Sequence, residues 1–397
     1  MTHYKFIIVS LVFLGFSNAK AQEIITLETA VKLALENNYE IKIASNNSII
    51  NTTNVAVGNT GMLPVVTATV AANNRVQNSS QTLQTGVVNS LDNAKNNSLN
   101  YGVNLDWTVF DGFKMFAKLD QLKELQKLGE ARLKQTILTK ISAVTSTYFD
   151  LVQQQQQLEA LDSTIVISNQ RLALAQNRFI IGKASKLEVL NAQVDLNTDK
   201  VTLLRQKDLY ANTKILFNQI LARDTKTNFK VIDAIHVDAA LVLNELTALA
   251  EKQNPQLEAQ IIALKVAELQ LKQVKANRYP SLKLSTGYNL ANTQASLGFA
   301  TATSAKGFNY GFSAALNLFD GFAQNRNEKI AQLQIENSKL TIDQQKLALH
   351  SQLATSFQTY LTNLELIRLE DKNEAIAKQN LAITLDKFKI GTITTLE

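Results

Sequence analysis

The chain has 397 residues, with 40 Lys and Arg against 34 Asp and Glu, 45% apolar residues and no cysteine. This length and apolar content are sufficient to bury a core. The absence of cysteine excludes a disulfide scaffold, a thiolate metal site, a cysteine nucleophile and a lipidated cysteine. The small basic excess is spread along predicted helices without forming a basic block, so the sequence gives no support to nucleic-acid binding.

Residues 1–21 have the pattern of a secretory signal peptide. Lys5 supplies the positive region, residues 6–16 are largely apolar, and Ala19-Lys20-Ala21 is an A-x-A cleavage site. An anchor across the bilayer needs about 20 apolar residues, and this segment is too short. No apolar run of about 18 residues follows it, so we expect a secreted protein or one that meets the membrane through β-strands.

The sequence after the signal peptide reads as an internal duplication. Residues 101–113 and 310–322 share six of 13 positions and end in the same Phe-Asp-Gly-Phe sequence. We predict a first repeat over residues 22–221, a linker over 222–243 and a second repeat over 244–397. Since the first repeat continues past the partner of the last residue, we expect about 33 further residues to be missing from the second.

Each repeat contains a predicted β-hairpin, at about 64–110 and about 280–319. From Ser98 to Phe110 apolar and polar residues alternate strictly, which is typical of strands in an outer-membrane barrel, with apolar residues toward lipid. An ordinary half-buried sheet is the weaker alternative. Residues 77–97 and 291–307 are rich in Asn, Ser, Gln and Thr, so we expect exposed loops there. The residues expected to face lipid are Leu99, Tyr101, Val103, Leu105, Trp107, Phe308, Tyr310, Phe312 and Leu316.

A long helix is predicted after each hairpin, over about 114–181 and about 322–390. The first lacks proline and would extend about 100 Å at 1.5 Å per residue. Apolar residues every seven positions from 137 to 179 indicate a coiled-coil seam. A glycine then ends each helix at a tight tip, at 182 and at 391, and we expect a return helix over about 183–221.

An open sheet edge is costly in hydrocarbon, and a membrane barrel needs at least about eight strands. A chain with four strands must therefore share its barrel with copies of itself. Two chains would give a barrel filled by side chains, whereas three would give twelve strands and an open interior. The polar residues on the inner faces favour three chains or more.

These features resemble the TolC family of outer-membrane efflux ducts. The resemblance rests on the Phe-Asp-Gly junctions, on the duplicated layout and on the segment from Arg178 to Gln193, which is similar to the family's Arg-Phe-x-x-Gly…Leu-x-Val-Leu-x-Ala-Gln pattern. It implies an α+β membrane protein, a homotrimer whose 12-stranded barrel continues into a periplasmic tunnel of antiparallel coiled-coil helices. It also implies a location in the outer membrane of a Gram-negative bacterium and docking with a periplasmic adaptor and an inner-membrane transporter.

The resemblance further implies roles for particular residues. The helix tips would dock with the adaptor, and an acidic residue after the second tip would help to close the tunnel. The docking residues are Arg178, Phe179, Ile181, Gly182, Lys183, Ala184, Phe388, Ile390, Gly391 and Thr392, and the candidate gate residue is Glu397. At the strand-to-helix junctions, Asp111 and Asp320 are suited to cap the helices, and Gly112 and Gly321 to form the sharp turns.

An enzyme is disfavoured, because no Walker A loop, GxSxG or HExxH motif is present. We expect no cofactor and no metal site, since His236 and His350 have no ligand spacing. An adhesive or structural coiled-coil protein of the cell surface would explain the heptads but not the alternating strands. The exported substance is left open among drugs, peptides, metals and whole proteins.

Overall fold

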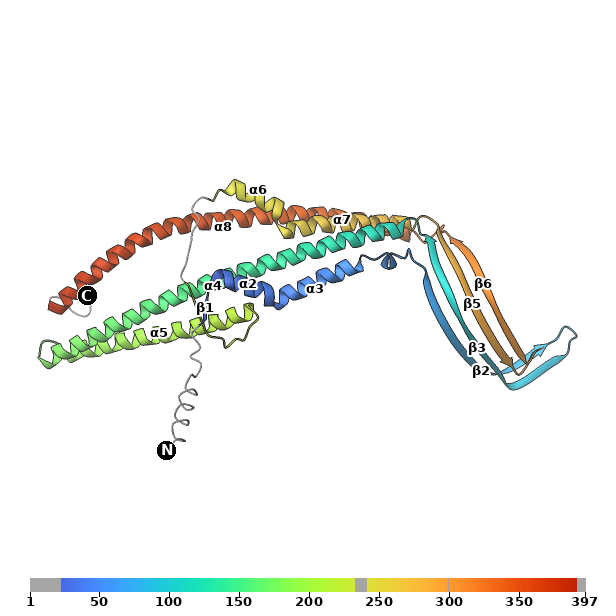
Figure 1. Ribbon diagram of the computed structural model, residues 1–397, viewed down its shortest axis with the longest axis horizontal. Helices are drawn as coiled ribbons and strands as arrows, with labels where there is room; N and C mark the ends of the chain where they lie inside the picture. Colours follow the sequence, from blue (N-terminus) through green and yellow to red (C-terminus); the bar gives the residue numbers. More distant parts are fainter. Residues whose placement is uncertain (1–22, 233–240, 299, 391–397) are drawn as a thin grey trace, which may run out of the picture. The chain divides into compact units, whose positions relative to one another are not determined.

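The computed structural model describes residues 23–232, 241–298 and 300–390 (Figure 1). The chain forms two compact units. The helical unit consists of Met1–Ser45, Leu133–Gln253 and Ala348–Glu397, and the sheet unit consists of Asn46–Arg132 and Asn254–Leu347. The predicted signal peptide lies outside the described residues.

Helices and strands follow one another in an order that alternates hairpins with long helices. They are β1 (Glu23–Ile25), α2 (Leu27–Asn37), α3 (Tyr39–Asn54), the 3₁₀ helix η1 (Val57–Thr60), β2 (Val65–Thr82), β3 (Val88–Phe110), α4 (Lys114–Ile180), α5 (Lys186–Ile220), β4 (Phe229–Val231), α6 (Leu243–Gln253), α7 (Pro255–Ala276), β5 (Ser281–Ala295), β6 (Ala302–Ala315) and α8 (Ala323–Ile390).

The core of the helical unit surrounds a small parallel sheet of β1 and β4 that the sequence patterns do not predict. Its buried side chains come from both strands and from α2, α4 and α5, and include Ile25, Leu151, Phe217 and Phe229. Aromatic rings pack together there, with the centroids of Phe217 and Phe229 5.5 Å apart. Three-residue strands carry too little pattern to be recognised, and the packing of the helices around them decides their pairing.

Tyr148 of α4 ties this small sheet to the long helix. Its ring is buried, and its hydroxyl lies 3.2 Å from the carbonyl oxygen of Ile25 and 3.0 Å from that of Ile232. The backbone nitrogen of Ile232 also lies 3.2 Å from the hydroxyl oxygen of Tyr148, and its N–H donates to that oxygen. One hydroxyl therefore contacts backbone groups of Ile25, the last residue of β1, and of Ile232, which follows β4, groups that burial would otherwise penalise.

Side-chain caps determine where several helices begin. Thr26 accepts a hydrogen bond at the start of α2, Ser185 at the start of α5 and Asn254 at the start of α7. Asn38 accepts from the first turn of α3 and donates to the carbonyl oxygen of Ile220 at 2.8 Å. Such caps satisfy N–H groups that have no partner inside the helix. The Ser185 cap explains why the return helix begins at Lys186, after the predicted residue 183.

The predicted seven-residue seam of α4 is buried where α5 and the small sheet cover it. Val144 and Leu151 are fully buried, and Ala175 packs with Val189 and Ala192 of α5 nearer the tip. Phe179, the last seam residue, is 42% exposed. The seam is therefore buried beside the small sheet, half-buried at Leu158, Ile165 and Leu172, and exposed at the tip.

The sheet unit contains a four-stranded antiparallel sheet in the order β2-β3-β5-β6. The prediction of loops over 77–97 and 291–307 is wrong for most of these residues, since β2 extends to Thr82, β3 begins at Val88 and β5 extends to Ala295. Backbone pairing across the hairpins continues through the Asn- and Ser-rich sequence, whose side chains make it look like a loop. Within the two hairpins, residues 83–87 connect β2 to β3 and residues 296–301 connect β5 to β6.

The register aligns the alternating faces of all four strands. Ala68 pairs with Val103, Val103 with Tyr288 and Tyr288 with Phe308, and the second row along from this one joins Leu284, Trp107 and Phe312. Because the side-chain period is two, these rows lie on one face, where Leu99, Tyr101, Leu105 and Tyr310 also lie. Leu316 comes just after the end of β6. This face is apolar along the halves of the strands nearer the helices except at Thr286, and it becomes polar farther along, where Asn292, Ser304 and Lys306 share it.

The opposite face is polar and carries an asparagine ladder. Asn289 of β5 donates to the side-chain oxygen of Asn104 in β3 at 3.0 Å and of Asn309 in β6 at 2.9 Å. In the helical part of the sheet unit, Leu128 and Ala131 of α4 pack against Ala259 and Ile262 of α7. This packing holds the start of α4 beside α7.

We expect Tyr148→Phe to lower the free energy of unfolding by about 1–3 kcal/mol, because it leaves buried carbonyl groups without their donor. Thermal unfolding followed by circular dichroism measures this. Tyr210→Phe is the matched control, since Tyr210 is only partly buried and its hydroxyl makes a single 3.3 Å bond to Gln155. Equal effects of the two variants would contradict the structural role given to Tyr148.

Candidate functional site

The turn between α4 and α5 forms the described helix tip. Gly182 has a φ of 74°, its N–H donates to the carbonyl oxygen of Phe179 at 3.0 Å, and the N–H of Lys183 donates to that of Arg178 at 2.7 Å. These two bonds define a Schellman motif, with glycine at the left-handed position that ends the helix. A side chain on Gly182 would meet no atom within 4 Å, so backbone strain alone favours glycine.

An ion pair closes the tip on its inner side. A guanidinium nitrogen of Arg178 lies 3.5 Å from a carboxylate oxygen of Glu188, and both side chains are largely covered. Ser185 lies three residues before Glu188 and accepts from its backbone N–H at 3.3 Å. The cap thus holds Glu188 in the first turn of α5, where the helix dipole and Arg178 both stabilise a negative charge.

The outer side of the tip is apolar and uncovered. Ile180 is 77% exposed, Ile181 is 65% exposed, and Leu187 and Leu190 of α5 are also exposed. The ammonium group of Lys186 lies 5.6 Å from the centre of the Phe179 ring. A rigid turn that presents branched apolar side chains is suited to contact with another protein.

The structure describes less of the second tip. Helix α8 ends at Ile390, which is exposed. Gly391, Thr392 and Glu397 lie outside the described residues, as does the side chain of Phe388. The predicted roles of these residues in docking and gating therefore stay predictions.

The two strand-to-helix junctions have the same backbone conformation. Gly112 and Phe113 have φ values of 72° and 68°, and Gly321 and Phe322 have 64° and 65°. Asp111 accepts from the N–H of Met115 at 3.2 Å, and Asp320 accepts from that of Gln324 at 2.8 Å. Each aspartate therefore satisfies an N–H in the first turn of the helix that follows.

The space around the two glycines differs. A Cβ at Gly112 would lie 2.4 Å from the carbonyl oxygen of Ala276, whereas a Cβ at Gly321 would meet nothing within 4 Å. Gly112 is thus required both by its φ and by the close approach of α7, and Gly321 by its φ alone.

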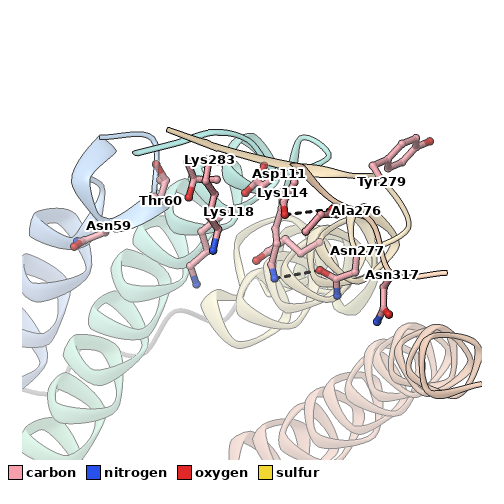
Figure 2. A pocket seen from close by; sticks show the side chains of 15 residues that line it. Asn59, Thr60, Asp111, Lys114, Lys118, Ala276, Asn277, Tyr279, Lys283 and Asn317 are labelled. Atoms are coloured by element: carbon pink, nitrogen blue, oxygen red, sulfur yellow. Dashed lines mark hydrogen bonds between the residues drawn. The ribbon is translucent and has the colours of Figure 1, made fainter. Parts of the chain in front are cut away.

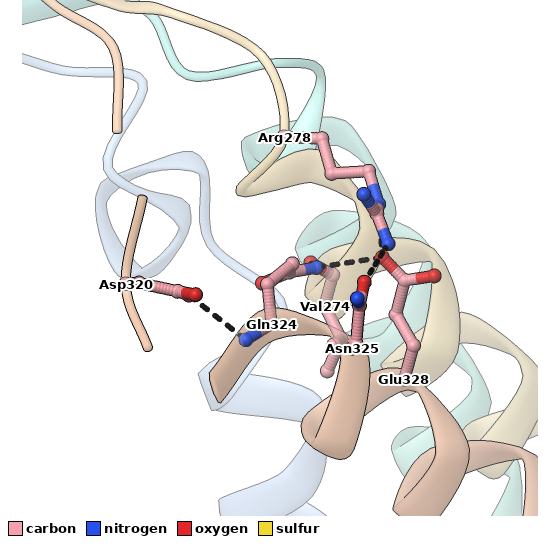
Figure 3. A network of polar contacts seen from close by, with 6 residues as sticks. All are labelled: Val274, Arg278, Asp320, Gln324, Asn325 and Glu328. Atoms are coloured by element: carbon pink, nitrogen blue, oxygen red, sulfur yellow. Dashed lines mark hydrogen bonds and ion pairs between the residues drawn. The ribbon is translucent and has the colours of Figure 1, made fainter. Parts of the chain in front are cut away.

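The second junction carries a polar network that sequence patterns do not reveal (Figure 3). Arg278, just after α7, donates to the carboxylate of Glu328 and, at 2.8 Å, to the side-chain oxygen of Asn325. Gln324 donates to the same carboxylate at 2.8 Å and to the carbonyl oxygen of Val274 at 2.7 Å. The hydrogen bond from Arg278 is the main cause of a lowered pKa for Glu328. Only the i, i+4 spacing of Gln324 and Glu328 is visible in the sequence.

The described residues contain no grouping of three or more potential metal ligands. His350 lies 2.7 Å from a carboxylate oxygen of Glu251 at the surface, and His236 lies outside the described part. No helix in the described ranges is long and apolar enough to cross a membrane.

Comparison with known proteins gives a consistent result. A family model described as outer membrane efflux protein matches residues 30–222 and 246–397. The protein CyaE of Bordetella pertussis is 24% identical over 277 residues, which cover 67% of this chain and 56% of CyaE. The outer membrane protein TolC of Vibrio cholerae is 23% identical over 319 residues, which cover 78% of this chain and 72% of TolC.

The fold also matches a solved structure. A crystal structure of CusC, described as forming a transmembrane channel, has a TM-score of 0.74 and 14% identity, and the match covers 93% of this chain and 83% of CusC. At this level of identity the likeness concerns the fold. The chain spans just over half the length of CyaE.

We expect Gly182→Val to destabilise the tip by about 1–2 kcal/mol, because a branched residue is strained in the left-handed conformation. Gly182→Asn should have a smaller effect, since asparagine tolerates that conformation. Hydrogen exchange of the Lys183 N–H measures both. Exchange that is equally slow in the wild type and in the valine variant would contradict the assigned turn.

Glu328 should make stability depend on pH in the acid range. Its pKa is lowered in the folded state, so its contribution is present above the unfolded value of 4.5 and is lost as pH falls through the folded pKa. We therefore expect the melting temperature of the wild type to fall more steeply below about pH 4.5 than that of Glu328→Gln. Glu336→Gln, on the same helix, serves as the control and should retain the steep dependence.

Proposed function

Because the chain belongs to the outer membrane efflux protein family, we propose that it forms the outer-membrane exit duct of a tripartite efflux or type I secretion system. The predicted resemblance to this family is confirmed, as is the location in the outer membrane of a Gram-negative bacterium. The family is one of efflux proteins and not an enzyme class. The duct would be passive, and its partners would supply the energy.

The four-stranded sheet is the observation that carries this proposal. Its order leaves β2 and β6 with one unpaired edge each within the described chain, and one face carries mostly apolar rows along the halves of the strands nearer the helices. In a membrane those edges need partners, since an unsatisfied backbone group costs several kcal/mol in hydrocarbon. Three copies with four strands each would close a twelve-stranded barrel whose apolar face meets lipid and whose polar face lines the interior.

Two features support an internally duplicated, trimeric duct. The Gly-Phe turns at 112–113 and 321–322 have matching φ values at matching places in the two repeats. Each turn feeds a helix of nearly the same length, 67 residues in α4 and 68 in α8. Three copies of two long helices with their return helices would continue the barrel as a helical tunnel.

The exposed tip supports docking with a periplasmic adaptor. The apolar residues Ile180, Ile181 and Leu187 project from a turn that the Schellman bonds and the Arg178–Glu188 pair hold in place. The adaptor would pack against these side chains and connect the duct to an inner-membrane transporter.

Reconstitution in planar bilayers tests the proposed function. We expect the purified protein to run as a trimer in mild detergent and to produce stepwise ion conductance. Ile181→Asp should leave the conductance intact and weaken the binding of the adaptor, because it places a charge on the apolar tip. Leu204→Asp is a control on an exposed part of α5 away from the tip. A monomer that ignores lipid and conducts no ions would overturn the duct, and would favour a coiled-coil surface protein.

A further inference from the structure

A cavity of about 640 Å³ opens in the sheet unit, where the sheet meets the helices (Figure 2). Residues from several elements line it. Thr108 and Lys283 come from the sheet, Lys114 and Lys118 from the first turns of α4, and Thr60 from η1. Two lysines one helical turn apart in α4 therefore share one cavity with Lys283, which is distant in the sequence.

The charge of this cavity is strongly unbalanced. Asp111 is the one acidic residue in its lining, and its carboxylate already accepts the N–H of Met115. Lys114 donates to the amide oxygen of Asn277 at 3.3 Å and Lys118 to that of Gln121 at 3.2 Å, both neutral groups. Within the described part of the chain no carboxylate pairs with any of the three lysines.

The strand residues of the cavity lie on the polar face of the sheet. Thr108 pairs with Lys283 across β3 and β5, and Lys283 pairs with Ser313 across β5 and β6. Their positions share the period of Asn104 and Asn289 in the asparagine ladder. The cavity therefore opens on the face that would line the interior of the proposed duct.

We propose that Lys114, Lys118 and Lys283 form an anion-binding site that receives carboxylate or phosphate groups of a dissolved molecule passing through the duct. The inference rests on the proposed function and narrows its cargo to molecules that carry such groups. Ammonium groups bind carboxylate and phosphate oxygens as mobile point charges. Three copies of the chain would place nine lysines around one passage against three copies each of Asp111 and of Asp106 on the same polar face, and the positive excess concentrates anions and repels small cations.

Neutral side chains next to the lysines suit this role. Thr108 and Asn277 line the same cavity and offer a hydroxyl and an amide donor to an anion. The amide partners of Lys114 and Lys118 hold those side chains without neutralising them. The site would bind weakly and release readily, as a passage requires, because exposed ion pairs are each worth less than about 1 kcal/mol.

Ion selectivity in bilayers of neutral phosphatidylcholine tests the proposal. Under a gradient of potassium chloride, the reversal potential of the wild type should show preference for chloride, and Lys114→Gln, Lys118→Gln and Lys283→Gln together should remove it. Citrate should block the wild-type conductance at about tenfold lower concentration than that of the triple variant. Lys272→Gln, on an exposed part of α7 outside the cavity, is the matched control.

The single variant Lys283→Glu provides a second test in case the triple variant does not fold. Its side chain is exposed and has no hydrogen-bond partner in the described part of the chain, so the trimer should persist while the reversal potential shifts toward the cation side. Conductance with unchanged selectivity in these variants would overturn the anion site and leave the duct intact. Absence of conductance in the wild type would overturn the duct itself.

A separate arm distinguishes a dissolved anion from a lipid headgroup. Phosphatidylglycerol added to the bilayer should leave the concentration of citrate needed for block unchanged. If this lipid instead relieves the block in the wild type but not in Lys283→Glu, the cavity holds a lipid phosphate, and the proposed role in passage is wrong.

Discussion

The architecture of this chain depends on one requirement: each buried backbone N–H and C=O group needs a hydrogen-bond partner. A strand exposes such groups along both edges, and where all four strands lie side by side the sheet leaves mainly the outer edges of β2 and β6 unpaired. In water those edges would be solvated, but in hydrocarbon they have no substitute for another strand. The apolar rows on one face of the sheet favour the proposed membrane setting, where this need is greatest. In the proposed duct, self-assembly, a closed wall and a polar interior would all follow from that need.

The same need shapes the turns. Where α4 ends, the Schellman bonds at Gly182 satisfy carbonyl groups that the helix leaves free. Where α4 and α8 begin, Asp111 and Asp320 satisfy N–H groups, and the glycine after each turns the chain out of the strand. Side chains and turns thus satisfy some of the backbone groups left free where long helices begin and end. The rigidity of these turns is what allows a few exposed side chains to form a defined surface.

Sequence patterns predict the parts of this fold in which one period extends over many residues. The long helices were expected at about 114–181 and 322–390 and are found at Lys114–Ile180 and Ala323–Ile390. The patterns fail where composition and backbone pairing disagree, as in the Asn-rich halves of β2 and β3. They also fail for β1 and β4, which are too short to show a period. Neither the Arg278–Glu328 pair nor the lysine cavity could be predicted, because their members come together only through strand register and helix packing. For the same reason, the lysines of the cavity form no basic block in the sequence, where Lys283 lies far from Lys114 and Lys118.

The strands of the first hairpin, β2 and β3, are longer than β5 and β6 and extend beyond them. β5 pairs with β3 only from Asn96 onward, so Gln77–Thr82 and Val88–Ala94 continue as a two-stranded ribbon beyond the rest of the sheet. Its connecting residues 83–87 carry exposed side chains at both ends and close with a single turn. A foreign peptide inserted there would lengthen the ribbon and leave the four-stranded ladder untouched. The end of this hairpin is therefore a suitable position for the display of an epitope.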